Sequence, residues 1–203
     1  MNWFIASNNQ HKIREFQEIL PNHKVFGPLD LAAEFNHQEI ETSFAMNALG
    51  KATELWRLIQ EHQAFQPGSL IIADDSGLVV PALGGAPGVY SARYCAQPGH
   101  PELTDHQRNQ LLLANLQGVT QRQAYYVCSL VLVHGLDRFD CVQETWEGEI
   151  ALAESQGTGG FGYDPLFYLP DLKSTVAELG EGIKSRISHR SKAVQRLIKF
   201  ALD

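Results

Sequence analysis

The chain has 203 residues, 44% of them hydrophobic and 19% charged, with a formal net charge of −7 at pH 7. These values are typical of one soluble globular domain with a sizeable core and argue against intrinsic disorder. An acidic balance disfavours binding to a nucleic-acid duplex, because duplex-binding proteins carry a basic stripe that neutralises phosphates. The sequence has no run of about 18 apolar residues that would predict a membrane span, and its start lacks the basic and apolar regions of a signal peptide. We therefore expect a cytoplasmic protein that does not bind membranes.

A short apolar strand is expected at residues 2–6, followed by a polar loop that leads into an amphipathic helix. The loop runs from Ser7 to Lys12 and contains Ser and Asn, which are helix-capping types. Free backbone amides at a helix N-terminus favour anions, whereas a cation such as Lys12 in the first turn opposes the helix dipole. An anion held between the loop and Lys12 would remove this conflict. An ordinary cap with a solvated lysine is the alternative.

The next elements are a strand at residues 24–26 and a helix that starts near residue 44. The helix is predicted from apolar residues at helical spacing, which are Phe44, Ala48, Ala52, Leu55 and Ile59. Glu34, Glu39 and Glu41 precede it. Acidic residues at such a position complement the helix dipole, and a role as a metal ligand is the alternative.

The central stretch is an apolar run, residues 70–73, followed directly by Asp74, Asp75, Ser76 and Gly77. The run predicts a buried strand that ends at the two carboxylates and turns at Ser76 and Gly77, since all four polar residues favour turns. Neighbouring side chains on a strand point to opposite faces. The turn would bring at least one carboxylate into a site at the carboxyl end of the strand. Such a pair suits a phosphate ligand accompanied by Mg²⁺, and a plain turn is the alternative.

The second half of the chain predicts a helix at residues 105–116, a strand hairpin at 123–150 and a glycine-rich loop at 157–165. Four glycines in that loop permit close approach of the backbone to a ligand. The aromatic rings of Phe161 and Tyr163 suit contact with a flat base, and the alternative is a structural loop with Phe161 in the core.

A last helix is expected to start near Ser188, a plausible N-cap. Lys184, His189 and Arg190 cluster where a helix N-terminus already attracts negative charge, which indicates an anionic partner. The cysteines are odd in number and lack CxxC spacing, so they predict neither a disulfide framework nor a zinc site. Cys128 lies in an apolar run and is expected in the core.

Together these segments resemble the inosine triphosphate pyrophosphatase family. The resemblance is carried by ADDSGLVVPALGGAPGVYSARY at residues 73–94, GTGGFGYDPLFY at 157–168 and SHR at 188–190, and it covers the chain from end to end. It implies a single domain, residues 1–203, with an elongated two-lobed α/β fold. A long twisted mixed β-sheet flanked by helices, an active-site cleft between the lobes and a homodimer are further implications.

The reaction implied by the resemblance is Mg²⁺-dependent hydrolysis of dITP, ITP or XTP to the nucleoside monophosphate and pyrophosphate. This reaction removes deaminated purines from the nucleotide pool. Asp75 matches the general base and metal-linked carboxylate, and Glu39 is favoured over Glu41 as a further metal ligand. The implied substrate-binding residues are Ser7, Asn8, Asn9, Gln10, His11, Lys12, Ser76, Phe161, Gly162, Tyr163, Asp164, Lys184, His189 and Arg190.

The sequence departs from the family pattern at two places. The family loop reads TGNxxK, whereas this chain has Ser7, Asn8 and Asn9 before Lys12, and Asn tolerates positive φ better than most residues. Met46 stands where the family has an acidic residue. Two other functions stay open from the residues alone: a regulator that binds a purine triphosphate without hydrolysing it, which would not need the acidic pair, and a phosphatase that releases orthophosphate.

Overall fold

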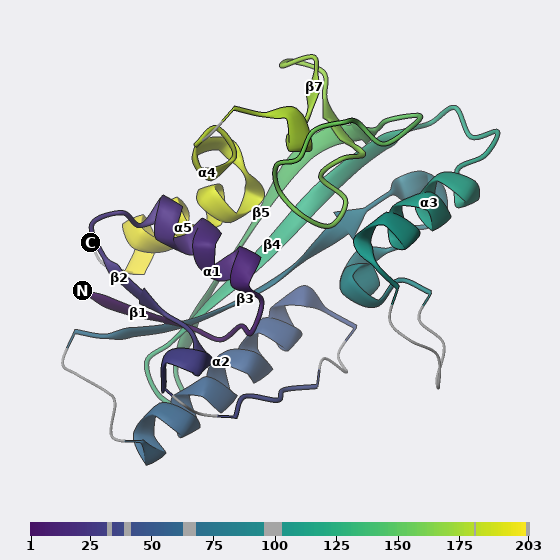
Figure 1. Cartoon of the computed structure of the whole chain (residues 1–203). Coiled ribbons are helices and arrows are strands. Elements are labelled where there is room, and N and C mark those ends of the chain that lie inside the picture. The colour runs from purple at the N-terminus through teal and green to yellow at the C-terminus, as the bar shows by residue number, and fades with distance from the viewer. Residues whose placement is uncertain (32–33, 39–41, 63–67, 96–102, 181, 202–203) are drawn as a thin grey trace. The chain divides into compact units, whose positions relative to one another are not determined.

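The computed structural model describes residues 1–31, 34–38, 42–62, 68–95, 103–180 and 182–201 (Figure 1). The chain divides into two compact units. The first unit comprises Met1–Asp75, Cys128–Glu144 and Ser185–Asp203, and the second comprises Ser76–Val127 and Thr145–Lys184. The family resemblance implied one domain, an elongated shape and a cleft between lobes; these features stay predictions.

One seven-stranded mixed sheet has the strand order β2-β1-β3-β4-β5-β6-β7. β1 pairs in parallel with β2 and β3, and β6 pairs antiparallel with β5 and β7. The strands are β1 (Asn2–Ile5), β2 (Lys24–Phe26), β3 (Leu70–Val79), β4 (Gln123–Val133), β5 (Phe139–Ile150), β6 (Phe167–Leu169) and β7 (Ser174–Thr175). The expected α/β class with a mixed sheet flanked by helices is therefore confirmed.

Four of the described α-helices fall close to the predicted ranges, and the short α4 was not predicted. The described helices are α1 (Gln10–Ile19), α2 (Phe44–Glu61), α3 (Asp105–Asn115), α4 (Lys184–Ile187) and α5 (His189–Ala201), with 3₁₀ segments at Pro28–Leu31, Pro81–Leu83, Gly88–Arg93 and Val176–Glu178. Within the described ranges, no helix is both long enough and apolar enough to cross a membrane.

In the first unit, helices pack on both faces of the sheet, because alternate strand residues point to opposite sides. Trp3 and Ile72 belong to the cluster that also holds residues of α1 and α5. Phe4 and Ile71, their neighbours in sequence, belong to the cluster formed with α2. Both faces of β1 and β3 are thus buried, which explains why these parallel strands read as continuous apolar runs.

The second unit has its own core around the ring of Phe167. The ring centroid of Tyr126 lies 4.5 Å from that of Phe167, and the ring centroid of Trp146 lies 5.7 Å from it. Helix α3 begins at a capping box, in which the Thr104 and Gln107 side chains each bond the backbone of the other. Such a cap fixes where the helix starts and how its first turn is oriented.

The prediction that the central strand ends at Asp74 and Asp75 is wrong. β3 continues through Ser76 and Gly77 to Val79. Local turn propensity is overridden, because cations from elements on both faces bond the two carboxylates inside the sheet. Burying a paired charge removes the need for the strand to end where polar residues begin.

Candidate active site

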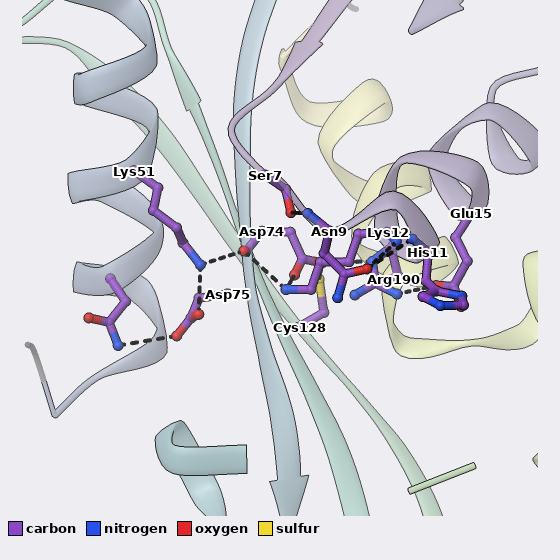
Figure 2. A network of polar contacts seen from close by, with 11 residues as sticks. Ser7, Asn9, His11, Lys12, Glu15, Lys51, Asp74, Asp75, Cys128 and Arg190 are labelled. Atoms are coloured by element: carbon purple, nitrogen blue, oxygen red, sulfur yellow. Dashed lines mark hydrogen bonds and ion pairs between the residues drawn. The ribbon is translucent and has the colours of Figure 1, made fainter. Parts of the chain in front are cut away.

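Asp74 and Asp75 lie back to back on β3 and are nearly excluded from solvent, at 0% and 4% exposure. Figure 2 shows the two side chains leaving the strand on opposite sides, as strand geometry requires. Asp74 points to the face covered by α1 and α5, and Asp75 points to the face covered by α2. The two carboxylates therefore have separate sets of partners.

Asp74 is held by two cations and a thiol (Figure 2). Lys12 Nζ lies 2.6 Å from Asp74 Oδ1, and Arg190 Nε lies 2.8 Å from Oδ2. Cys128 Sγ donates to Oδ2 at 3.2 Å. Burial by itself would raise the pKa of Asp74, but Arg190 and Lys12 outweigh it and hold the pKa well below its usual range. Asp74 is therefore ionised at neutral pH.

Arg190 is fixed between two carboxylates. Its Nη1 pairs with Glu15 of α1, and its Nε bonds Asp74, while the residue is only 1% exposed. Burial alone would lower the pKa of Arg190, but Asp74 and Glu15 raise it above its ordinary value. The guanidinium lies 5.8 Å from the ring centroid of Phe16. The side chain that the sequence placed among substrate contacts thus also links α5, α1 and β3.

Asp75 is oriented by two residues of α2 that the sequence analysis missed. Lys51 Nζ lies 2.8 Å from Asp75 Oδ1 and also donates to the Asp74 carbonyl oxygen at 2.8 Å. Asn47 Nδ2 donates to Asp75 Oδ2 at 3.2 Å. A signal was present, because both residues fall on the apolar face of α2 beside Ala48. A lysine at such a position needs a carboxylate partner.

The loop before α1 is ordered by its own side chains. Ser7 Oγ accepts from the Asn9 backbone amide at 3.1 Å. Asn9 is the N-cap of α1, and its Oδ1 accepts from the amides of His11 and Lys12 at 2.9 and 3.3 Å. The start of the helix is therefore capped, and the ammonium of Lys12, whose side chain is 14% exposed, pairs with Asp74.

Two further loop residues were predicted to bind substrate. Asn8 Nδ2 donates to the Phe35 carbonyl oxygen at 2.7 Å, and Gln10 is exposed at the first position of α1. Among the described residues, Cys95 and Lys173 are the non-glycine residues with positive φ. Asn8 therefore replaces the family glycine without adopting a left-handed backbone.

The glycine-rich loop of the second unit is built around Asp164, which is 1% exposed. Asp164 Oδ2 accepts from the Phe161 amide at 2.8 Å and pairs with Lys184 Nζ at 2.5 Å. The same ammonium lies 4.7 Å from the ring centroid of the half-buried Phe161. Tyr163 is buried, and its hydroxyl donates to the Ser91 carbonyl oxygen at 2.9 Å.

The remaining predicted residues are placed individually. Ser76 is half-buried on β3, and His189 is the first residue of α5, at 4% exposure. Ser188 caps that helix as expected, because its Oγ accepts from the Ser191 amide at 3.2 Å. Glu39 and Glu41 lie outside the described residues.

Among the residues that the structure describes, the ion pairs of the cluster in the first unit join equal numbers of cations and carboxylates. The cations are Lys12, Lys51 and Arg190, and the carboxylates are those of Glu15, Asp74 and Asp75. A phosphate-bearing ligand would therefore have to bring its own cations or exchange with one of these carboxylates. In the part of the chain that the structure describes, no group of three or more His, Cys, Asp or Glu residues is arranged to hold a metal ion.

Comparison with known proteins gives consistent results. Residues 3–200 match the model of the Ham1 family. A dITP/XTP pyrophosphatase of Treponema denticola is 40% identical over 200 residues, covering 98% of each chain. One from Nitrosomonas europaea is 41% identical over 205 residues, covering 97% of this chain and 92% of that protein. The solved structure of the Staphylococcus aureus Ham1 protein superposes with a TM-score of 0.78 at 37% identity, covering 98% of this chain and 97% of that one.

Proposed function

This chain belongs to the Ham1 family, and we propose that it hydrolyses dITP, ITP and XTP to the nucleoside monophosphate and pyrophosphate. This activity would remove deaminated purines from the nucleotide pool. The names of the relatives support the substrate class. The observation that carries the proposal is the buried polar cluster at Asp74 and Asp75, in which ionised groups are held on both faces of one strand.

Asp75 is the residue that we assign as the general base. Lys51 bonds its Oδ1 and Asn47 bonds its Oδ2, so the carboxylate is fixed in orientation. An ammonium stabilises negative charge on Oδ1 more strongly than a neutral amide stabilises it on Oδ2. Oδ2 is therefore the oxygen that accepts the proton of the attacking water. The water oxygen bonds to the α-phosphorus while the α–β bridging bond breaks, and pyrophosphate leaves.

Mg²⁺ is the cofactor that we propose. The described ion pairs of the cluster in the first unit join equal numbers of cations and carboxylates, which favours a substrate that arrives with a divalent cation. Mg²⁺ binds through one or two carboxylates together with the phosphates of the substrate, and Asp75 offers such a carboxylate. Glu39, or alternatively Glu41, is the further ligand that we expect. Such an ion would offset the charge that develops on the phosphate oxygens.

Substrate binding is assigned to residues of each unit. In the first unit, Lys12, His189 and Arg190 would contact the substrate, together with the capped loop before α1. In the second unit, Lys184 and the loop from Phe161 to Asp164 would contact the base, for which the half-buried ring of Phe161 is suited. Preference for a 6-oxo purine requires hydrogen-bond donors to O6, and we propose that they come from backbone amides of the glycine-rich loops.

The test is a product assay with Mg²⁺ and dITP, XTP, dATP or dGTP in parallel. Formation of monophosphate and pyrophosphate from dITP and XTP, with dATP and dGTP nearly untouched, is the expected result. Asp75→Asn should lower turnover by about 10²–10⁴-fold with little loss of binding. The matched control is Asp137→Asn, which removes an exposed carboxylate from the β4–β5 connection and should leave turnover unchanged. Orthophosphate as product would indicate a phosphatase, and binding without turnover would indicate a regulator.

We also propose that the protein acts as a homodimer in the cytoplasm, as the family resemblance implies. Light scattering coupled to size-exclusion chromatography measures the mass directly. A mass equal to that of one 22.6 kDa chain at assay concentrations would exclude the dimer.

A further inference from the structure

Gly162, in the middle of the glycine-rich loop, is held by helix α3 at both of its backbone polar groups. The Gly162 amide donates to Asp105 Oδ2 at 2.6 Å. Asn109 Nδ2 donates to the Gly162 carbonyl oxygen at 3.2 Å. Asp105 and Asn109 are four residues apart and therefore lie on one face of the helix. Two consecutive turns of α3 thus fix one peptide segment of the loop.

This segment would otherwise have wide conformational freedom. Gly160 and Gly162 have φ values of +73° and +63°, a region that glycine enters readily and other residues avoid. A glycine-rich loop loses much entropy when a ligand fixes it. Side chains of the protein that hold such a loop in its binding conformation remove that cost from the binding step.

We call the two hydrogen bonds from Asp105 and Asn109 to Gly162 the clamp. The first turn of α3, which carries Asp105, is itself restrained. Thr104 and Gln107 form the capping box that begins α3. Arg108 pairs with Asp105 Oδ1, so the carboxylate is oriented by a cation on one oxygen and by the Gly162 amide on the other. Asp105 is thereby held toward the loop although its side chain is 47% exposed.

Asn109 is buried at 1% exposure and contributes only one of its two polar atoms. Its Oδ1 has no hydrogen-bond partner among the described residues. A buried acceptor without a partner destabilises the fold, and an apolar residue at this position of α3 would avoid that cost. The hydrogen bond from Nδ2 to the Gly162 carbonyl oxygen is the interaction that an apolar residue would lose.

The opposite side of the same turn is fixed by Asp164, which accepts from the Phe161 amide and pairs with Lys184. Asp164 therefore sets the start of the turn, and α3 sets its middle. We propose that Asp105 and Asn109 are positioning residues that hold the Phe161–Asp164 turn in its base-binding conformation. This inference rests on the proposed function, because it assigns recognition of the purine base to that turn.

The experiment separates base recognition from phosphate binding. KM and kcat are measured with dITP, and inorganic tripolyphosphate, which has no base, is used as a competitive inhibitor. The variants are Asp105→Ala, which removes the acceptor, Asp105→Asn, which retains an amide oxygen, and Asn109→Asp, which opposes a carboxylate to the Gly162 carbonyl. Gln110→Ala is the matched control, since Gln110 lies on the same helix but donates to Glu154 instead of to the Phe161–Asp164 turn.

Asp105→Ala and Asn109→Asp should each raise the KM for dITP about 10-fold, the effect of one or two lost hydrogen bonds. We expect kcat and the inhibition constant of tripolyphosphate to stay within about twofold of wild type. Asp105→Asn should recover most of the loss, and Gln110→Ala should behave as wild type. An unchanged KM, or an equal rise in the tripolyphosphate constant, would overturn the inference.

Hydrogen exchange of the Gly162 amide gives a readout that needs no turnover. Exchange should accelerate about 10-fold in Asp105→Ala, and unchanged protection would contradict the clamp. If the wild-type protein does not hydrolyse dITP, the proposed function fails. Calorimetry with IMP and tripolyphosphate then decides the inference, since weakened IMP binding alone would support it and unchanged IMP binding would refute it.

Discussion

Asp74→Asn tests whether the buried ion pairs at β3 support the fold. The substitution keeps the shape of the side chain and removes its charge. Arg190, at 1% exposure, then keeps its pair with Glu15 but loses its charged partner at Nε, and Lys12 loses the carboxylate charge that it contacts at 2.6 Å. Removing one partner of a buried pair destabilises a protein by about 3–5 kcal/mol. For a chain of this length the melting temperature should fall by about 6–20 °C.

The effect of pH has a definite sign. The pKa of Asp74 in the folded protein lies well below its ordinary value, because Arg190 and Lys12 outweigh the effect of burial. A depressed pKa contributes stability that is fully present above the unfolded-state pKa, about 3.9, and is lost as the pH falls through the folded-state value. The difference in unfolding free energy between wild type and Asp74→Asn should be largest at pH 7 and shrink below about pH 4.

Urea denaturation followed by tryptophan fluorescence measures this difference at each pH. The control is Glu144→Gln, which breaks the pair with Arg196 on α5, the helix that also carries Arg190. Because the Arg196 side chain is 64% exposed, its loss should cost no more than about 1 kcal/mol. A difference for Asp74→Asn below about 1 kcal/mol at pH 7, or one that stays constant into acid, would refute the reasoning.

Three further substitutions or reactions test other parts of the structure. Lys51→Met should destabilise the protein by about 3–5 kcal/mol and abolish dITP turnover, since Asp75 loses its ammonium partner. Normal activity with a lowered melting temperature would show that Lys51 supports the fold and not the reaction. Gly157→Ala should lower the unfolding free energy by about 1–3 kcal/mol, because its Cβ would lie 2.3 Å from the Ala177 carbonyl oxygen, and an unchanged denaturation midpoint would contradict that packing. Burial and a neighbouring carboxylate raise the pKa of Cys128 well above its ordinary value. A disulfide reagent at pH 8 should therefore modify the exposed Cys95 and Cys141 and react with Cys128 only after unfolding.

Most of the secondary structure was predictable because its causes are local. The α2 helix shows apolar residues at a period near four, and the structure places it at Phe44–Glu61. Asn9 and Ser188 were predicted as capping types, and each accepts from backbone amides of the helix that follows. These signals depend on residues within one or two turns of one another.

The C-terminal end of β3 was not predictable from local signals. Asp74, Asp75, Ser76 and Gly77 favour a turn by composition, yet they form the middle of a strand. Whether the strand continues depends on cations that are brought in by α1, α2 and α5. Those partners are 23 to 116 residues away in the chain.

For the candidate site, the types of residue were readable from the sequence and their pairings were not. Motifs identified Lys12, Asp75 and Arg190 as chemically important. Only the tertiary structure decided that Lys12 and Arg190 bond Asp74, and that Lys51 serves Asp75 on the opposite face. The physical reason is that which charges pair depends on their proximity and desolvation, and both depend on how the helices pack against the sheet. Such packing produces no periodic pattern in the sequence from which the pairs could be predicted.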